Sequence, residues 1–288
     1  MREAAPQTLA ARHRARAEAL VARRDPRLHA FFAYIFRRAI RADFHALRLD
    51  RESVVPEPDA PHLVIYANHP SWWDAALYNV LHPMLFGRRP GFAPLDAAML
   101  EQYRFMGRIG AIGVDQSTRA GAAAFLSTCA YVMEAPERML WVAAQGEFAD
   151  ARRRPLALRP GLAHLAARAP QAQFVPLAVE YTFWDERTPE ALIRFGLPVP
   201  ASELVSLGKA EGATRLEAAL TETLDALAEN AISRDPARFR TLLSGRVGVG
   251  GVYDLWRRAR ALASGRRFEA AHNPAAHRPT PGEAEGAP

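Results

Sequence analysis

Short apolar segments alternate with helical ones through the middle of this 288-residue chain. Segment 62–66 reads HLVIY, a β-branched run typical of a buried strand, and helical signals follow it as far as Leu81. Further strands are expected at 110–114, 139–143, 174–181 and 193–195, with helices at 120–133 and 161–168. Strands separated by helices indicate βαβ units. The predicted fold is therefore α/β, with a mostly parallel mixed sheet flanked by helices.

Helical patterns lie on both sides of this region. Residues 1–25 are polar and basic, whereas residues 28–47 interleave aromatic residues with arginines. That second pattern suits a helix in a lipid headgroup layer, and equally a helix packed on the domain with a solvated basic edge. A leucine stripe predicts a helix at 214–232, and a basic helix is expected at 252–262.

These patterns divide the chain into four expected parts. They are N-terminal basic, amphipathic helices with membrane contact at 1–50, an α/β core at 51–205, a C-terminal helical appendage at 206–270 and a disordered tail at 271–288.

The chain has a net charge of +6, and almost all of its positive charge is arginine, since Lys209 is the only lysine. A basic balance favours anionic partners such as a lipid surface or an acidic carrier protein, although a genomic preference for arginine codons explains the same excess. No nucleic-acid recognition motif accompanies the charge, so no nucleic-acid partner is expected.

The single cysteine, Cys129, cannot form an intrachain disulfide, which favours a reducing compartment and a core position for its side chain. No signal peptide is expected, and no apolar run approaches the roughly 18–20 residues that span a bilayer. No clustered Cys and His residues or Gly-rich phosphate loop is present, so neither a metal nor a bound cofactor is expected.

The segment NHPSWWD follows the first predicted strand and contains His69 and Asp74. His45 and Asp50 have the same spacing, but they follow a basic helix without a preceding strand. Catalytic groups in parallel sheets lie at the carboxyl ends of strands, which favours the His69 pair. Asn68 is a helix-capping type, and proline suits the first helical turn that would follow.

A histidine and a carboxylate within one turn can activate a hydroxyl. A neutral imidazole takes the hydroxyl proton as the new bond forms, and a carboxylate on the other ring nitrogen fixes the tautomer. The acceptor's own hydroxyl would replace the serine of a Ser-His-Asp triad, and Trp72 and Trp73 would exclude water. A polar histidine that caps a loop is the alternative interpretation of His69.

NHPSWWD resembles the first motif of the glycerolphosphate and lysophosphatidate acyltransferase superfamily. Three later segments resemble its second, third and fourth motifs in the same order: GAIGVDQ at 110–116, AQGE at 144–147 and VPLAV at 175–179. The resemblance spans residues 62–181. It implies an acyl-CoA or acyl carrier protein donor, and a dyad of His69 and Asp74 that acts without an acyl-enzyme intermediate.

The departures from the superfamily concern phosphate recognition. Gln116 stands where the second motif usually has an arginine, and Gln145, Gly146 and Glu147 alter the third. Each lost charge-assisted bond removes about 1.5–3 kcal/mol, so phosphate binding should weaken. Arginines at 152–154 and 159 either substitute for them or belong to a solvated loop.

The sequence thus predicts an O-acyltransferase for a neutral or glycosylated lipid, such as a terpenoid or carotenoid glycoside. Gln116, Gln145, Gly146, Glu147, Trp72 and Trp73 are the expected substrate-binding residues. A conventional lysophosphatidate acyltransferase of phospholipid biosynthesis and a non-catalytic peripheral membrane protein are the alternatives. The expected location is the cytoplasmic face of a bacterial-type membrane.

Overall fold

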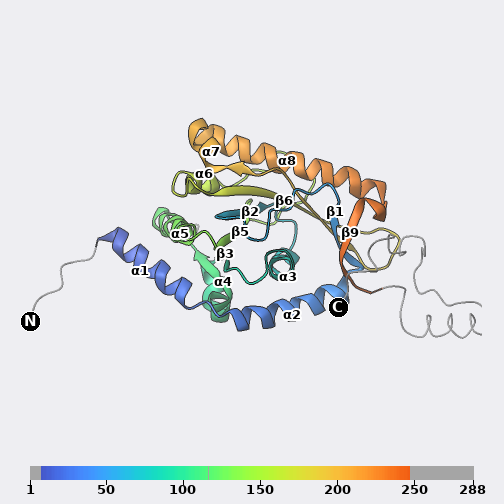
Figure 1. The fold of residues 1–288 in the computed structure, drawn as a ribbon, viewed down its shortest axis with the longest axis horizontal. Helices are drawn as coiled ribbons and strands as arrows, with labels where there is room; N and C mark the ends of the chain where they lie inside the picture. Colours follow the sequence, from blue (N-terminus) through green and yellow to red (C-terminus); the bar gives the residue numbers. More distant parts are fainter. Residues whose placement is uncertain (1–7, 116, 247–288) are drawn as a thin grey trace, which may run out of the picture.

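The computed structural model describes residues 8–115 and 117–246, which form one mixed sheet between two groups of helices (Figure 1). The strands are β1 Ala46–Asp50, β2 Leu63–Ala67, β3 Gly91–Asp96, β4 Ala111–Val114, β5 Met139–Ala143, β6 Gln173–Thr182, β7 Glu190–Phe195, β8 Val199–Pro200 and β9 Phe239–Ser244. Their order is β4-β3-β5-β2-β6-β7-β1-β9, with β8 paired to β6. Five pairings are parallel and three antiparallel, which confirms the predicted fold class.

The helices cover the two faces of the sheet in separate groups. They are α1 Leu9–Ala22, α2 Pro26–Asp43, α3 Trp73–Phe86, α4 Ala97–Gln102, α5 Arg119–Val132, α6 Gly161–Ala166, α7 Ala201–Leu207 and α8 Lys209–Ser233, with 3₁₀ turns η1 Arg104–Ile109 and η2 Pro236–Arg238. Helices α2 and α3 pack on one face and α5 to α8 on the other. Each group of helices encloses a hydrophobic core against its face of the sheet. Alternate side chains of β2 enter these two cores, so the whole strand is buried and apolar.

The register of the central strands sets the position of the site. Ala67 at the end of β2 is level with Ala143 of β5 and Leu177 of β6. Because these three strands are parallel, their carboxyl ends meet at one edge of the sheet. The segments that follow β2 and β5 therefore lie side by side, where ligands bind in open α/β sheets.

The sheet extends beyond both predicted limits of the α/β core. Strand β1 lies in the part predicted as N-terminal helices, since α2 ends at Asp43, and β9 lies in the part predicted as C-terminal helices. In β1, Leu47 is buried, and so is Arg48, which donates to Glu190 of β7 at 2.9 Å. The buried charge of Arg48 is thus paired with a carboxylate on another strand. Because that partner is far away in the sequence, the residues around Arg48 did not indicate a strand.

Helix α8 is an integral part of the core rather than an appendage. Its leucine stripe is buried against the sheet with α5 to α7, at Leu216, Leu220, Leu224 and Leu227. The expected helix at 252–262 and the expected disorder at 271–288 lie outside the described residues. Within the described part of the chain, no helix combines the length and apolarity needed to cross a membrane.

Residues 91–109 form β3, α4 and η1, a segment for which the sequence predicted no structure. Pro94 interrupts the strand pattern of β3, and α4 and η1 have six residues each, too few for a helical period to stand out. This segment walls the cavity described below.

Candidate active site

The two residues of the predicted dyad are in direct contact. His69 Nδ1 lies 2.6 Å from Asp74 Oδ2, because the chain turns between the end of β2 and the first turn of α3. The Asp74 side chain is fully buried, whereas that of His69 is 22% exposed. If Nδ1–H donates to the carboxylate, the lone pair of Nε2 is left for a substrate proton.

Asp74 is held by two further donors. The backbone N–H of Ser71 donates to Oδ2 at 3.2 Å, and the Tyr181 hydroxyl, at the end of β6, donates to Oδ1 at 2.7 Å. Burial, followed by the charge of Asp74, raises the pKa of Tyr181 well above its usual value. Tyr181 therefore remains a donor, which fixes the orientation of the carboxylate. Sequence reasoning missed it, although it lies just past the fourth motif.

The side chain of Gln145 holds the backbone of His69. Its Oε1 accepts from the His69 N–H at 2.8 Å and its Nε2 donates to the carbonyl of Leu156 at 3.0 Å. Gln145 is also buried, at 3% exposure. Its prediction as a substrate-binding residue is therefore corrected, because its amide positions the histidine.

Asn68 has a similar task and does not cap α3, as had been expected. Its side-chain amide donates to the Val179 carbonyl at 2.8 Å and accepts from the Val179 N–H at 2.9 Å. This pair of bonds continues the pairing of β2 with β6 beyond Ala67. The residue before the histidine is thereby fixed to the sheet.

The third motif divides between the cavity and solvent. Gly146 lines the cavity with a φ of 66°, a backbone conformation that favours glycine. Glu147 instead points to the surface, where its carboxylate pairs with Arg153 at 3.3 Å. It does not line the cavity, which does not support its predicted role in substrate binding. Phe148 lies beside the dyad, with its ring centroid 4.5 Å from that of His69.

The two tryptophans differ in environment. Trp72 lines the cavity and is 64% exposed, so it stands at the mouth. Trp73 packs edge-on against Phe44 at 5.0 Å and does not line the cavity, which corrects its predicted role. Gln116 lies outside the described residues.

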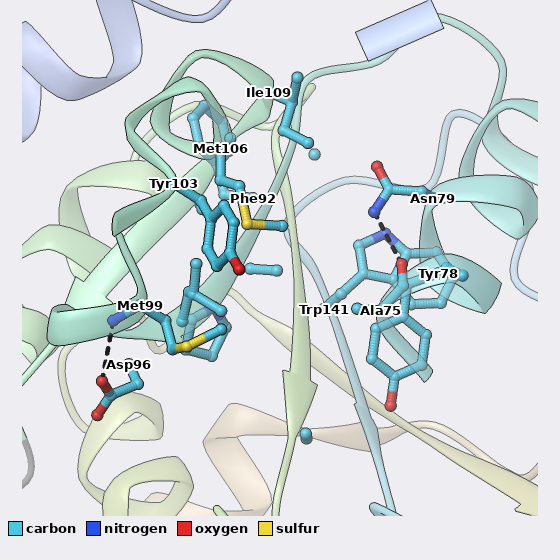
Figure 2. A pocket seen from close by; sticks show the side chains of 18 of the residues that line it. Ala75, Tyr78, Asn79, Phe92, Asp96, Met99, Tyr103, Met106, Ile109 and Trp141 are labelled. Carbon is cyan, nitrogen blue, oxygen red and sulfur yellow. Dashed lines mark hydrogen bonds between the residues drawn. The ribbon is translucent and has the colours of Figure 1, made fainter. Parts of the chain in front are cut away.

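A cavity of about 700 Å³ extends from the dyad between α3, β3 and η1. Figure 2 shows side chains of the 91–109 segment facing those of α3 and β5 across it. The lining is largely apolar and includes Phe36, Ala76, Tyr78, Phe92, Met99, Tyr103, Phe105, Met106, Ile109 and Trp141. Sequence reasoning missed this wall, because its residues carry no motif.

The arginines that follow the third motif are mostly neutralised. Arg152 pairs with Asp150 at 2.7 Å, Arg153 with Glu147, and Arg154 with Asp225 of α8. Paired cations attract a phosphate less strongly than free ones. The loop thus has less cationic character than its sequence implies.

Comparison with known proteins shows what the chain is similar to. Residues 47–180 match the model of the Acyltransferase family. No curated protein matches the sequence. Among solved structures, the chain is similar to the crystal structure of the 1-acyl-sn-glycerophosphate (LPA) acyltransferase PlsC from Thermotoga maritima. That similarity has a TM-score of 0.48 and 12% identity, and it covers 70% of this chain and 78% of PlsC.

The family match includes the dyad and all four predicted motifs, and it ends at residue 180, within β6. This match agrees with the acyltransferase family expected from the sequence, and it supports acyl transfer as the class of reaction. Over residues 47–180 of its α/β region, the chain is therefore similar to the acyltransferase family.

Proposed function

We propose that this protein is an O-acyltransferase that moves a fatty acyl group from acyl-CoA or acyl carrier protein to a lipid hydroxyl. The observation that carries the proposal is the 2.6 Å contact between His69 and a buried Asp74 at the mouth of an apolar cavity. His69 is the general base, and Asp74 orients it.

The proposed reaction needs no covalent enzyme intermediate. The acceptor hydroxyl gives its proton to His69 Nε2 while its oxygen bonds to the thioester carbonyl carbon. The C–S bond then breaks, and the imidazolium returns the proton to the departing thiolate. Asp74 stabilises the imidazolium between the two transfers, as the carboxylate of a Ser-His-Asp triad does.

The cavity supports an aliphatic donor chain. Its volume of about 700 Å³ and its apolar lining suit a ligand that loses hydrocarbon surface to the protein. The dyad lies at the mouth of the cavity, so a chain lying inside would present its thioester to His69.

The acceptor is proposed to be neutral or glycosylated, with a terpenoid or carotenoid glycoside as an example. The pairing of Arg152, Arg153 and Arg154 with carboxylates supports an acceptor without a phosphate dianion. Arg119, exposed at the start of α5, supports the alternative of a lysophosphatidate acceptor, since the part of the chain described gives it no ion-pair partner.

Contact with the inner face of a membrane is part of the proposal. Helix α2 exposes Phe31, Tyr34 and Ile35, at 55%, 57% and 40%, and its Phe36 lines the cavity. An amphipathic helix with arginines and aromatic side chains suits a lipid headgroup layer. Lipid chains would then reach the cavity without crossing water. The remaining alternative is a non-catalytic membrane protein. It does not explain why His69 and Asp74 are held in contact by further hydrogen bonds.

The test combines purified protein, labelled long-chain acyl-CoA and a total lipid extract, with products read by mass spectrometry and His69→Ala as control. A new acylated neutral or glycolipid that depends on His69 supports the proposal. Phosphatidate as the product supports the lysophosphatidate alternative. A product that forms equally with His69→Ala contradicts the mechanism. No His69-dependent product with either acyl-CoA or acyl carrier protein supports the non-catalytic alternative.

A further inference from the structure

The part of the cavity beside α2 and the start of β3 contains two histidines. His29 of α2 and His82 of α3 both line the cavity there, with ring centroids 5.2 Å apart in an edge-to-face arrangement. His82 follows Asp74 by eight residues on α3, which places it about 12 Å along the helix axis. A purely aliphatic acyl chain would make no hydrogen bond to either imidazole.

His82 has no free hydrogen-bonding capacity. Its Nε2 lies 2.8 Å from the carbonyl of Arg89, and its Nδ1 accepts from the indole N–H of Trp141 at 3.1 Å. A Cβ on Gly91 would lie 2.5 Å from this ring, so the backbone of β3 also fixes its place. His82 is thus a rigid part of the wall.

His29 keeps both ring nitrogens available. No hydrogen bond joins its ring to any residue in 8–115 or 117–246, although it is half-buried and lies against the cavity. Burial, and then the charge of Arg24, lower its pKa to about 4. A neutral imidazole offers one donor and one acceptor, which is the complement of a hydroxyl group.

Arg24 fixes the region behind His29. Its Nε donates to the carbonyl of Gly91 at 3.3 Å, so it joins the end of α1 to the start of β3. Arg24 is absent from the cavity lining, so of these two neighbours His29 is the one that a ligand would meet.

We infer that the cavity selects donor acyl chains that carry a hydroxyl at or near the end remote from the thioester, with His29 as the residue that binds it. This inference rests on the proposed function, because it assumes that the donor chain occupies the cavity. An unsubstituted chain would leave the His29 nitrogens without a partner, which disfavours it.

The test compares kcat/KM for ω-hydroxyacyl-CoA and unsubstituted acyl-CoA over a series of equal chain lengths. At the best length, the wild-type protein should prefer the hydroxylated donor about tenfold, the effect of one well-made hydrogen bond. His29→Leu should abolish the preference, and His29→Gln should retain part of it. His164→Leu, the same change on α6 away from the cavity, should leave it unaltered.

An equal preference in the wild-type and His29→Leu proteins would overturn the inference, and so would a preference for unsubstituted or ω-carboxylated donors. Failure of the proposed function is distinguishable, because no donor would then be turned over. In that event, the inference is tested by measuring the dissociation constants of ω-hydroxy and unsubstituted fatty acids for the His69→Ala protein. Tighter binding of the hydroxy acid, lost in His29→Leu, supports the inference, and equal binding overturns it.

Discussion

The chain contains His45–Asp50 and His69–Asp74, two pairs with identical spacing and opposite structural outcomes. His45 precedes β1 and Asp50 ends it, so an extended strand separates them by about 16 Å at 3.3 Å per residue. A turn and the start of α3 bring His69 within 2.6 Å of Asp74. Spacing alone therefore says little; the backbone conformation between two residues decides whether they meet.

The two pairs also differ in their partners. Asp50 accepts from Arg194 at 2.9 Å and from Asn230 at 2.7 Å, and His45 lies 3.7 Å from Glu190, so each has its own buried charged partner. Among residues 8–115 and 117–246, the hydrogen-bond partners of Asp74 are His69, Ser71 and Tyr181, and none of them is permanently charged. The first region stabilises the sheet, whereas the second keeps a histidine nitrogen free for chemistry.

Exchanging each aspartate for asparagine should separate the two regions most clearly. Asp74→Asn should lower kcat about a thousandfold, because the amide can stabilise the wrong tautomer of His69 and no longer stabilises an imidazolium. Asp50→Asn should lower the free energy of unfolding by about 1–3 kcal/mol, because Arg194 loses its buried carboxylate partner and retains the exposed Glu52. Chemical denaturation and steady-state kinetics on both variants check this, and an inactive but stable Asp50→Asn protein would contradict the division.

Removing one tyrosine hydroxyl from each core sharpens the same comparison. Tyr181→Phe should lower kcat about tenfold with KM unchanged, since Asp74 loses a donor. Tyr66→Phe removes a bond to the Leu216 carbonyl on the other face and should reduce only stability. An unchanged kcat in Tyr181→Phe would contradict its positioning role.

The smallest expected effect concerns pH. Burial lowers the pKa of His29 to about 4 and that of His82 to about 3, against about 6.5 in an unfolded chain. The unfolded state therefore binds more protons below pH 6.5, and the free energy of unfolding should fall as the pH drops from 6.5 towards 4. Denaturation at several pH values should give a shallower decline in His29→Leu than in His164→Leu. Parallel curves would mean that His29 titrates alike in both states.

The sequence predicted the elements that carry strong local patterns. Strand β2 has a continuous apolar run, and the motif after it correctly located the contact between His69 and Asp74. The role of Gln145 was not predictable, because its partner is the backbone of a residue 76 positions earlier in the chain.

Strand β1 and the cavity wall escaped prediction for related reasons. The charges of β1 are satisfied by β7 and α8, which only the fold brings near. The wall at 91–109 consists of elements too short or too interrupted to show a period, and its apolar side chains converge only in three dimensions.

The most direct test of the central claim is a side-by-side acyl-transfer assay of His69→Ala and His45→Ala, with the concentration of folded protein measured for each. If His69 is the general base, His69→Ala should lower transfer by a factor of about a thousand or more with an unchanged melting temperature. His45→Ala should keep its activity per folded molecule and melt earlier. Transfer that survives in His69→Ala, or is lost from folded His45→Ala, would contradict the account.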